Sequence, residues 1–225
     1  MSRNYIFSQD EYYHIYSRGY NKAPVFLDLP DYKRFVSLIY LSNSQTTLHR
    51  SDQFKKTIEE ITEVKRGLPL VSIGAYCLMP NHFHILVRGT SDGGISKFMQ
   101  KIMTGYTMYF NKRYERTGGL FGSTFKAVHV ATDEHLKYLF SYIHLNPVKL
   151  ISSEADWGTP NVPDSTTIKD FLSRYEFSSI HSYLSRPEIG FYSNKLLDKE
   201  NFPEYFSEGL GFDDFLEFFK GLSRI

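Results

Sequence analysis

The chain has 225 residues, 41% of them hydrophobic, and a net charge of +1 at pH 7. This composition is ordinary for a globular protein, and the near-neutral charge does not by itself indicate a nucleic-acid partner. We expect no membrane helix, no signal peptide and, with Cys77 as the single cysteine, no internal disulfide, which together fit a reducing, cytoplasmic location.

The first part of the chain predicts one strand and two helices. Glu11–Ser17 is rich in Tyr and Ile, as strands are. Apolar residues at helical spacing predict a helix from about Pro30 to Leu41, with the proline at its start. A second, short amphipathic helix is predicted over Gln53–Arg66, as an insertion between core elements.

The middle of the chain predicts three further strands and two helices. Leu68–Leu78 and His82–Arg88 are strands separated by a proline-containing break. A long helix over Ile95–Tyr114 carries an apolar face, and Thr124–Ala131 forms the fourth strand. Thr132 is a suitable N-cap for a last helix, which runs to about residue 145, where a following proline stops it.

This order of elements predicts an α+β fold: a ferredoxin-like, central antiparallel sheet with helices packed mainly on one face. We place the main domain in residues 1–150. Residues 151–225 are expected to form a C-terminal extension of loop and helix. Within it, Ile168–Leu184 predicts a helix broken near Phe177, and Phe212–Leu222 predicts an amphipathic helix.

The strand that begins at His82 carries a candidate metal-binding pair. Alternate side chains of a strand share a face, so His82 and His84 point the same way while Phe83, Ile85 and Val87 enter the core. Two imidazoles on one face of a rigid strand are able to chelate a metal ion. Taken alone, the same pattern also fits two histidines on a half-exposed strand.

A second candidate set lies on the last helix of the main domain. Tyr138, Tyr142 and Asn146 are four residues apart and therefore project from one side. If this helix packs beside the histidine strand, the two imidazoles, the amide of Asn146 and a tyrosine converge. His144 faces elsewhere and is expected to be structural.

The two stretches PNHFHILV and YIHLNPVK resemble the motifs of the HUH endonucleases, and more narrowly those of the single-tyrosine transposases, including the REP-associated tyrosine transposases. The resemblance covers roughly residues 5–150. It implies that Tyr142 is the catalytic nucleophile and that His82, His84 and Asn146 hold the metal. Two imidazoles alone suggest zinc or another late transition metal, whereas the resemblance implies Mg²⁺ or Mn²⁺, which also suit an amide oxygen.

The activity implied by this resemblance is endonuclease and strand transferase action on single-stranded DNA, at hairpins, through a 5′-phosphotyrosine intermediate. Residues 95–150 carry eight Lys and Arg residues against three Asp and Glu residues, a local excess of five positive charges that suits phosphates. Basic and aromatic side chains near the end of the long helix and beyond it are the candidate DNA contacts: Lys112, Arg113, Arg116, Phe121 and Lys126.

Several alternatives stay open at this point. Phe121 is equally well explained as a core residue, and Tyr138 shares the helix face of Tyr142. A DNA-hairpin-binding protein of the same fold without catalysis is the main alternative function, and a hydrolase that uses water on RNA or another phosphodiester is a third. The sequence also leaves both a monomer and a homodimer open.

Overall fold

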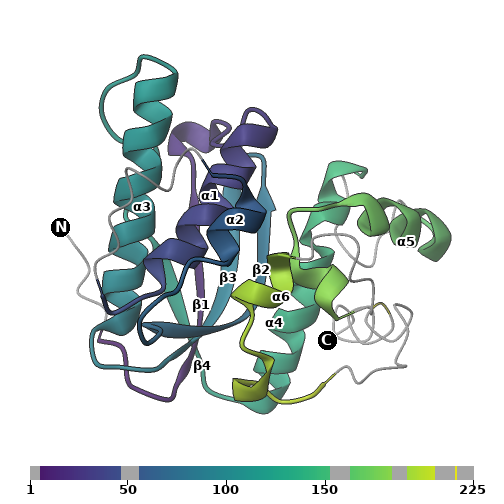
Figure 1. Ribbon diagram of the computed structural model, residues 1–225. Helices are drawn as coiled ribbons and strands as arrows, with labels where there is room; N and C mark the ends of the chain where they lie inside the picture. The colour runs from purple at the N-terminus through teal and green to yellow at the C-terminus, as the bar shows by residue number, and fades with distance from the viewer. Residues whose placement is uncertain (1–5, 47–55, 153–162, 184–191, 206–215, 217–225) are drawn as a thin grey trace.

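The computed structural model describes residues 6–46, 56–152, 163–183, 192–205 and 216 of the chain (Figure 1). Its centre is a four-stranded sheet in the order β2-β3-β1-β4, in which every neighbouring pair is antiparallel. The strands are β1 (Tyr12–Arg18), β2 (Val71–Met79), β3 (His82–Gly89) and β4 (Lys126–Val130). The predicted α+β class and antiparallel sheet are therefore confirmed.

Helices cover both faces of this sheet (Figure 1). On one face, α1 (Leu29–Ser42) and α3 (Gly94–Arg113) share the largest core cluster with inward side chains of β1, β2 and β3. On the other face, α4 (Asp133–Leu145) packs against β2 and β3 and continues into the short 3-10 helix η3 (Asn146–Leu150). The first face therefore carries most of the core, and the second carries the helix on which Tyr142 lies.

The remaining described elements are short. They are η1 (Tyr20–Lys22), α2 (Ile58–Thr62), α5 (Ser165–Arg174), η4 (Ser179–Ser182), α6 (Tyr192–Leu196) and η5 (Lys199–Asn201). Of the helix predicted over residues 53–66, residues 53–55 lie outside the described residues. In the described part the prediction was too long, because Thr57 caps the helix in a reciprocal capping box with Glu60 and the helix ends five residues later.

The alternation predicted for β3 is present in the structure. Phe83, Ile85 and Val87 are fully buried in the core shared with α1 and α3. His82 and His84 lie on the opposite face, towards α4. Burying one side of the strand fixes its register, because a one-residue slip would exchange the two sets of side chains.

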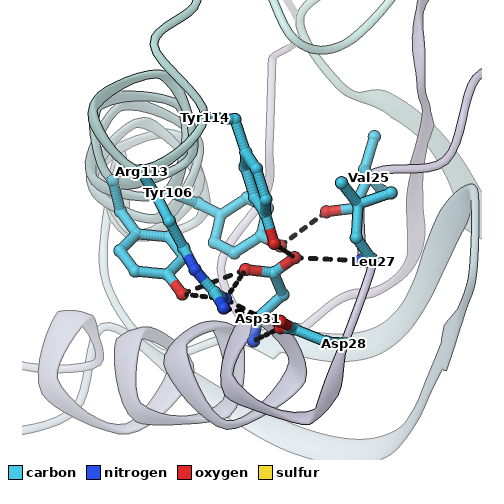
Figure 2. A network of polar contacts seen from close by, with 8 residues as sticks. Val25, Leu27, Asp28, Asp31, Tyr106, Arg113 and Tyr114 are labelled. Atoms are coloured by element: carbon cyan, nitrogen blue, oxygen red, sulfur yellow. Dashed lines mark hydrogen bonds and ion pairs between the residues drawn. The ribbon is translucent and has the colours of Figure 1, made fainter.

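A polar network joins the beginning of α1 to the end of α3 (Figure 2). The carboxylate of Asp31 is completely buried and accepts hydrogen bonds from the backbone N–H of Leu27 and from the Tyr109 and Tyr114 hydroxyls. Arg113 pairs with Asp31 at 2.7 Å and with the more exposed Asp28 at 2.5 Å. The network therefore holds two helices in place at sites 82 residues apart in sequence.

Part of the C-terminal extension lines the outer edge of β2. The backbone N–H of Leu78 donates to the Phe177 carbonyl at 2.9 Å, and Cys77 forms an isolated antiparallel bridge with Ser178. The break predicted near Phe177 is confirmed, since α5 ends before it and η4 follows it. The amphipathic helix predicted over residues 212–222 lies outside the described residues apart from Leu216, and the division at residue 150 stays a prediction.

Within the described residues, no helix combines the length and the apolar character needed to cross a membrane.

Candidate active site

Two histidines open β3 on the face that α4 covers. His84 is buried and His82 is half-buried, and their ring centroids are 5.0 Å apart. The imidazole Nδ1 of His82 lies 2.6 Å from the Asn81 side-chain oxygen, which accepts its hydrogen. This leaves Nε2 of His82 as an acceptor that points away from Asn81.

The helix α4 brings Asn146 and Tyr142 to these histidines. Thr132 caps the helix, as predicted, by accepting from the backbone N–H of His135. The Asn146 oxygen Oδ1 is 3.3 Å from Nε2 of His82, and the Tyr142 ring lies edge-on to His84 with 5.5 Å between centroids. All four residues singled out in the sequence therefore meet at one place.

The arrangement of these side chains fits a divalent cation. Nε2 of His84 and Nδ2 of Asn146 are buried and have no hydrogen-bond partner among the described residues. Two imidazole nitrogens and one amide oxygen form a mixed donor set that transition metals and Mn²⁺ accept. No three described His, Cys, Asp or Glu side chains form a metal cluster by themselves, and the candidate donor set here includes the amide oxygen of Asn146.

The protein environment keeps these imidazoles neutral, which is the state that binds metals. Burial lowers the pKa of His82 to about 4, opposed by its contact with Asn146 and reinforced by the positive charges of Arg18 and Lys149. Burial also lowers the pKa of His84 well below its ordinary value, helped by the neighbouring histidines. At neutral pH both rings are therefore uncharged, and each has one nitrogen without a hydrogen.

A cleft of about 570 Å³ opens in front of the histidines. It is bounded by the end of β1, the start of β3, the segment leading into β4, and α4 with η3. Arg18, Lys126 and Lys149 line it, and none of its described lining residues is acidic. Lys149 Nζ lies 5.0 Å from the centre of the Tyr142 ring, so the cleft places positive charge beside the tyrosine.

The sequence matches the family model described as "Transposase IS200 like" over residues 33–146, just over half of the chain. The chain belongs to the IS200-like transposases. This confirms the resemblance drawn from the two motifs and makes the protein, by class, an enzyme that binds and cleaves DNA. A search of curated protein sequences found no match.

Among solved structures, the transposase resembles a REP-associated tyrosine transposase bound to a REP hairpin. The two share 12% sequence identity and a TM-score of 0.51 over 93% of this chain and 92% of the other. At this identity the likeness is one of fold. The tRNA(His) guanylyltransferase from Saccharomyces cerevisiae aligns over 93% of this chain and 88% of its own, but its TM-score of 0.36 at 9% identity is too low to support an inference.

The five predicted DNA contacts of the transposase fall into different environments. Lys126 is exposed in the cleft, and Lys112 and Arg116 are exposed at the end of α3 and just beyond it. The guanidinium of Arg113 is engaged by Asp28 and Asp31, and Phe121 is buried in the main core. We therefore leave Arg113 and Phe121 out of the DNA-contacting surface, because one is paired and the other lacks an exposed ring face.

Sequence reasoning missed three residues of the site. His14 on β1 bonds His84, and Arg18 and Lys149 line the cleft. His14 and Arg18 precede the segment matched by the family model, and Lys149 follows it. Alternation along β1 places His14 and Tyr16 on one face, but only the pairing of β1 with β3 places that face beside His84.

Proposed function

We propose that this transposase is a divalent-metal-dependent enzyme that cleaves and rejoins single-stranded DNA at hairpins, with Tyr142 as the nucleophile. The observation that carries the proposal is the position of Tyr142, whose ring lies against His84 in the cleft where His82, His84 and Asn146 converge. Hairpin DNA is proposed because the solved transposase of similar fold is bound to one.

In this proposal the chain's own residues bind and orient the DNA strand. Arg18, Lys126 and Lys149 attract the phosphates that pass through the cleft. His82, His84 and Asn146 hold Mg²⁺ or Mn²⁺, which when bound polarises the scissile phosphate and offsets its developing charge.

The chemical step is an exchange of one phosphodiester for another. A bond forms between Tyr142 Oη and phosphorus while the bond from phosphorus to the 3′ oxygen breaks, so the 5′ end becomes attached to the protein. The phenol loses its proton to solvent, and the leaving 3′ oxygen takes one up. The phosphotyrosine retains the energy of the broken bond, so a later 3′-hydroxyl reverses the step without an external energy source. Lys149, whose Nζ lies 5.0 Å from the centre of the Tyr142 ring, brings positive charge to the place where the scissile phosphate would lie.

The experiment is a denaturing gel with labelled single-stranded hairpins taken from DNA flanking the gene, run with Mn²⁺ or Mg²⁺ and with a chelator. We expect a metal-dependent protein–DNA adduct that is lost in Tyr142→Phe. The matched control is Tyr138→Phe, because Tyr138 stacks on Tyr142 from the same helix face and should be dispensable.

Other outcomes of this gel are informative. An adduct that persists in Tyr142→Phe assigns the nucleophile to another residue. Cleavage without an adduct points to water as the nucleophile and to a hydrolase. Hairpin binding without either product supports a protein of this fold that binds DNA but no longer cuts it.

A further inference from the structure

His14 contacts a proposed metal ligand from outside both motifs. It lies on β1, it is buried, and its Nε2 is 2.8 Å from Nδ1 of His84. Its ring stacks on His84 with 5.0 Å between centroids, and it meets Tyr142 edge-on at 6.1 Å. The contact therefore fixes the orientation of the His84 ring from the side opposite its free nitrogen.

A hydrogen bond between two neutral imidazoles requires one hydrogen on one of the two facing nitrogens. If His84 Nδ1 carries it, Nε2 of His84 is left as an acceptor. If His14 Nε2 carries it, Nε2 of His84 must hold a hydrogen of its own, in a buried position without an acceptor among the described residues. An unsatisfied buried donor costs ~1–3 kcal/mol, which disfavours this second arrangement. In the first arrangement, the lone pair on Nε2 of His84 is available to a cation.

The neighbouring ligand shows the same arrangement. His82 has its Nδ1 bonded to Asn81 at 2.6 Å and its Nε2 directed to Asn146. His84 has its Nδ1 bonded to His14 and its Nε2 unpartnered. In both histidines Nδ1 contacts a residue that is not a proposed metal ligand, while Nε2 faces Asn146 in His82 and has no partner among the described residues in His84. Metal-binding histidines commonly have their second ring nitrogen engaged in this way.

We propose that His14 is a positioning residue that accepts the Nδ1–H of His84 and thereby holds Nε2 of His84 unprotonated and directed towards the cation. This inference rests on the metal site of the proposed function. It assigns to β1 a part in metal binding that neither motif contains.

The test is Mn²⁺ affinity of the full chain without DNA, measured from the electron paramagnetic resonance signal of free Mn²⁺. His14→Phe keeps the ring and removes the acceptor, and we expect its dissociation constant to rise by roughly 10–100-fold. His14→Gln retains an acceptor at a similar reach and should stay close to the wild-type value. His129→Gln is the matched control, because His129 is an exposed histidine of β4 that pairs with Glu11.

A second measurement does not depend on the variants. Nitrogen-15 spectra of the metal-free wild-type protein should show His84 protonated at Nδ1, and a hydrogen on Nε2 would overturn the inference. A folded His14→Phe variant with wild-type Mn²⁺ affinity would overturn it as well. If that variant fails to fold, His14→Gln and the wild-type spectra decide.

These results separate the inference from the proposed function. Mn²⁺ binding that depends on His14, without any DNA adduct, supports the inference and removes the proposed reaction. Adduct formation with unchanged Mn²⁺ affinity in His14→Phe removes the inference and leaves the reaction. A wild-type chain that binds no Mn²⁺ overturns the inference and the metal dependence together.

Discussion

Replacing Asp31 by Asn tests whether the network of Figure 2 is a main support of the fold. Each oxygen of Asp31 accepts two hydrogen bonds: Leu27 N–H and the Tyr114 hydroxyl reach Oδ2, and the Tyr109 hydroxyl and Arg113 reach Oδ1. Asparagine keeps only one oxygen. Its NH₂ group then faces two donors, and Arg113 loses the charge of its buried partner.

The expected loss follows from burial. Hydrogen bonds to a charged group contribute ~1.5–3 kcal/mol each, but part of this returns when the freed hydroxyls and Arg113, whose side chain is 31% exposed, reach water. Arg113 stays paired with Asp28, so the main cost comes from the two donors that face the new NH₂ group. At ~1–3 kcal/mol for each buried unsatisfied donor, we expect Asp31→Asn to cost ~2–5 kcal/mol.

Urea unfolding of the full chain at pH 7, followed by circular dichroism, measures this loss. Asp28→Asn is the matched control, because Asp28 pairs with the same guanidinium but its side chain is 43% exposed, and asparagine also serves as an N-cap. Such exposed pairs contribute ~0–1 kcal/mol. Equal losses for the two variants, or a loss below ~1 kcal/mol for Asp31→Asn, would refute the reasoning from burial.

Two further predictions concern the histidines and the cleft. Burial lowers the pKa of His14 to about 4 and that of His144 to about 3, below the ordinary 6.5, so the unfolded chain binds protons that the folded chain does not. The stability that these neutral rings contribute is complete above pH 6.5 and is lost as the pH falls towards 4, by ~1.4 kcal/mol per pH unit for each group. Urea unfolding at several pH values with chelator present measures this loss, and a free energy of unfolding that does not change with pH would contradict it. Lys126→Met and Lys149→Met should each reduce the slope of log affinity for single-stranded DNA against log salt by ~0.7, measured by fluorescence anisotropy, whereas Lys33→Met, on an exposed part of α1, should leave the slope unchanged.

The predictions that the structure confirms depend on local periodicity. Alternation along β3 placed His82 and His84 on one face, and helical spacing placed Tyr142 and Asn146 on one side of α4. Both patterns are properties of a single segment and need no knowledge of its neighbours. The two patterns did not establish that α4 packs beside β3. The structure shows this packing in the contact of Asn146 with His82.

The environments that the sequence did not indicate depend on partners far away in sequence. His14 contacts His84 only because β1 pairs with β3, which places it against a ring 70 residues away. Arg113 looks like a phosphate contact in a basic stretch, but its partners Asp28 and Asp31 come from α1. Composition and residue spacing do not predict such pairs, because the pairs form only when distant segments pack together.

The contacts of the C-terminal extension with β2 and α4 also join segments far apart in sequence, and no pattern within one segment predicts them. An edge strand such as β2 exposes unpaired backbone groups, and Ser179 satisfies some of them by bonding both the N–H and the carbonyl of Tyr76. The same hydroxyl lies 2.7 Å from Nε2 of His144, two residues beyond Tyr142 on α4. One serine of the extension therefore connects the edge of the sheet to α4, the helix on which Tyr142 contacts His84.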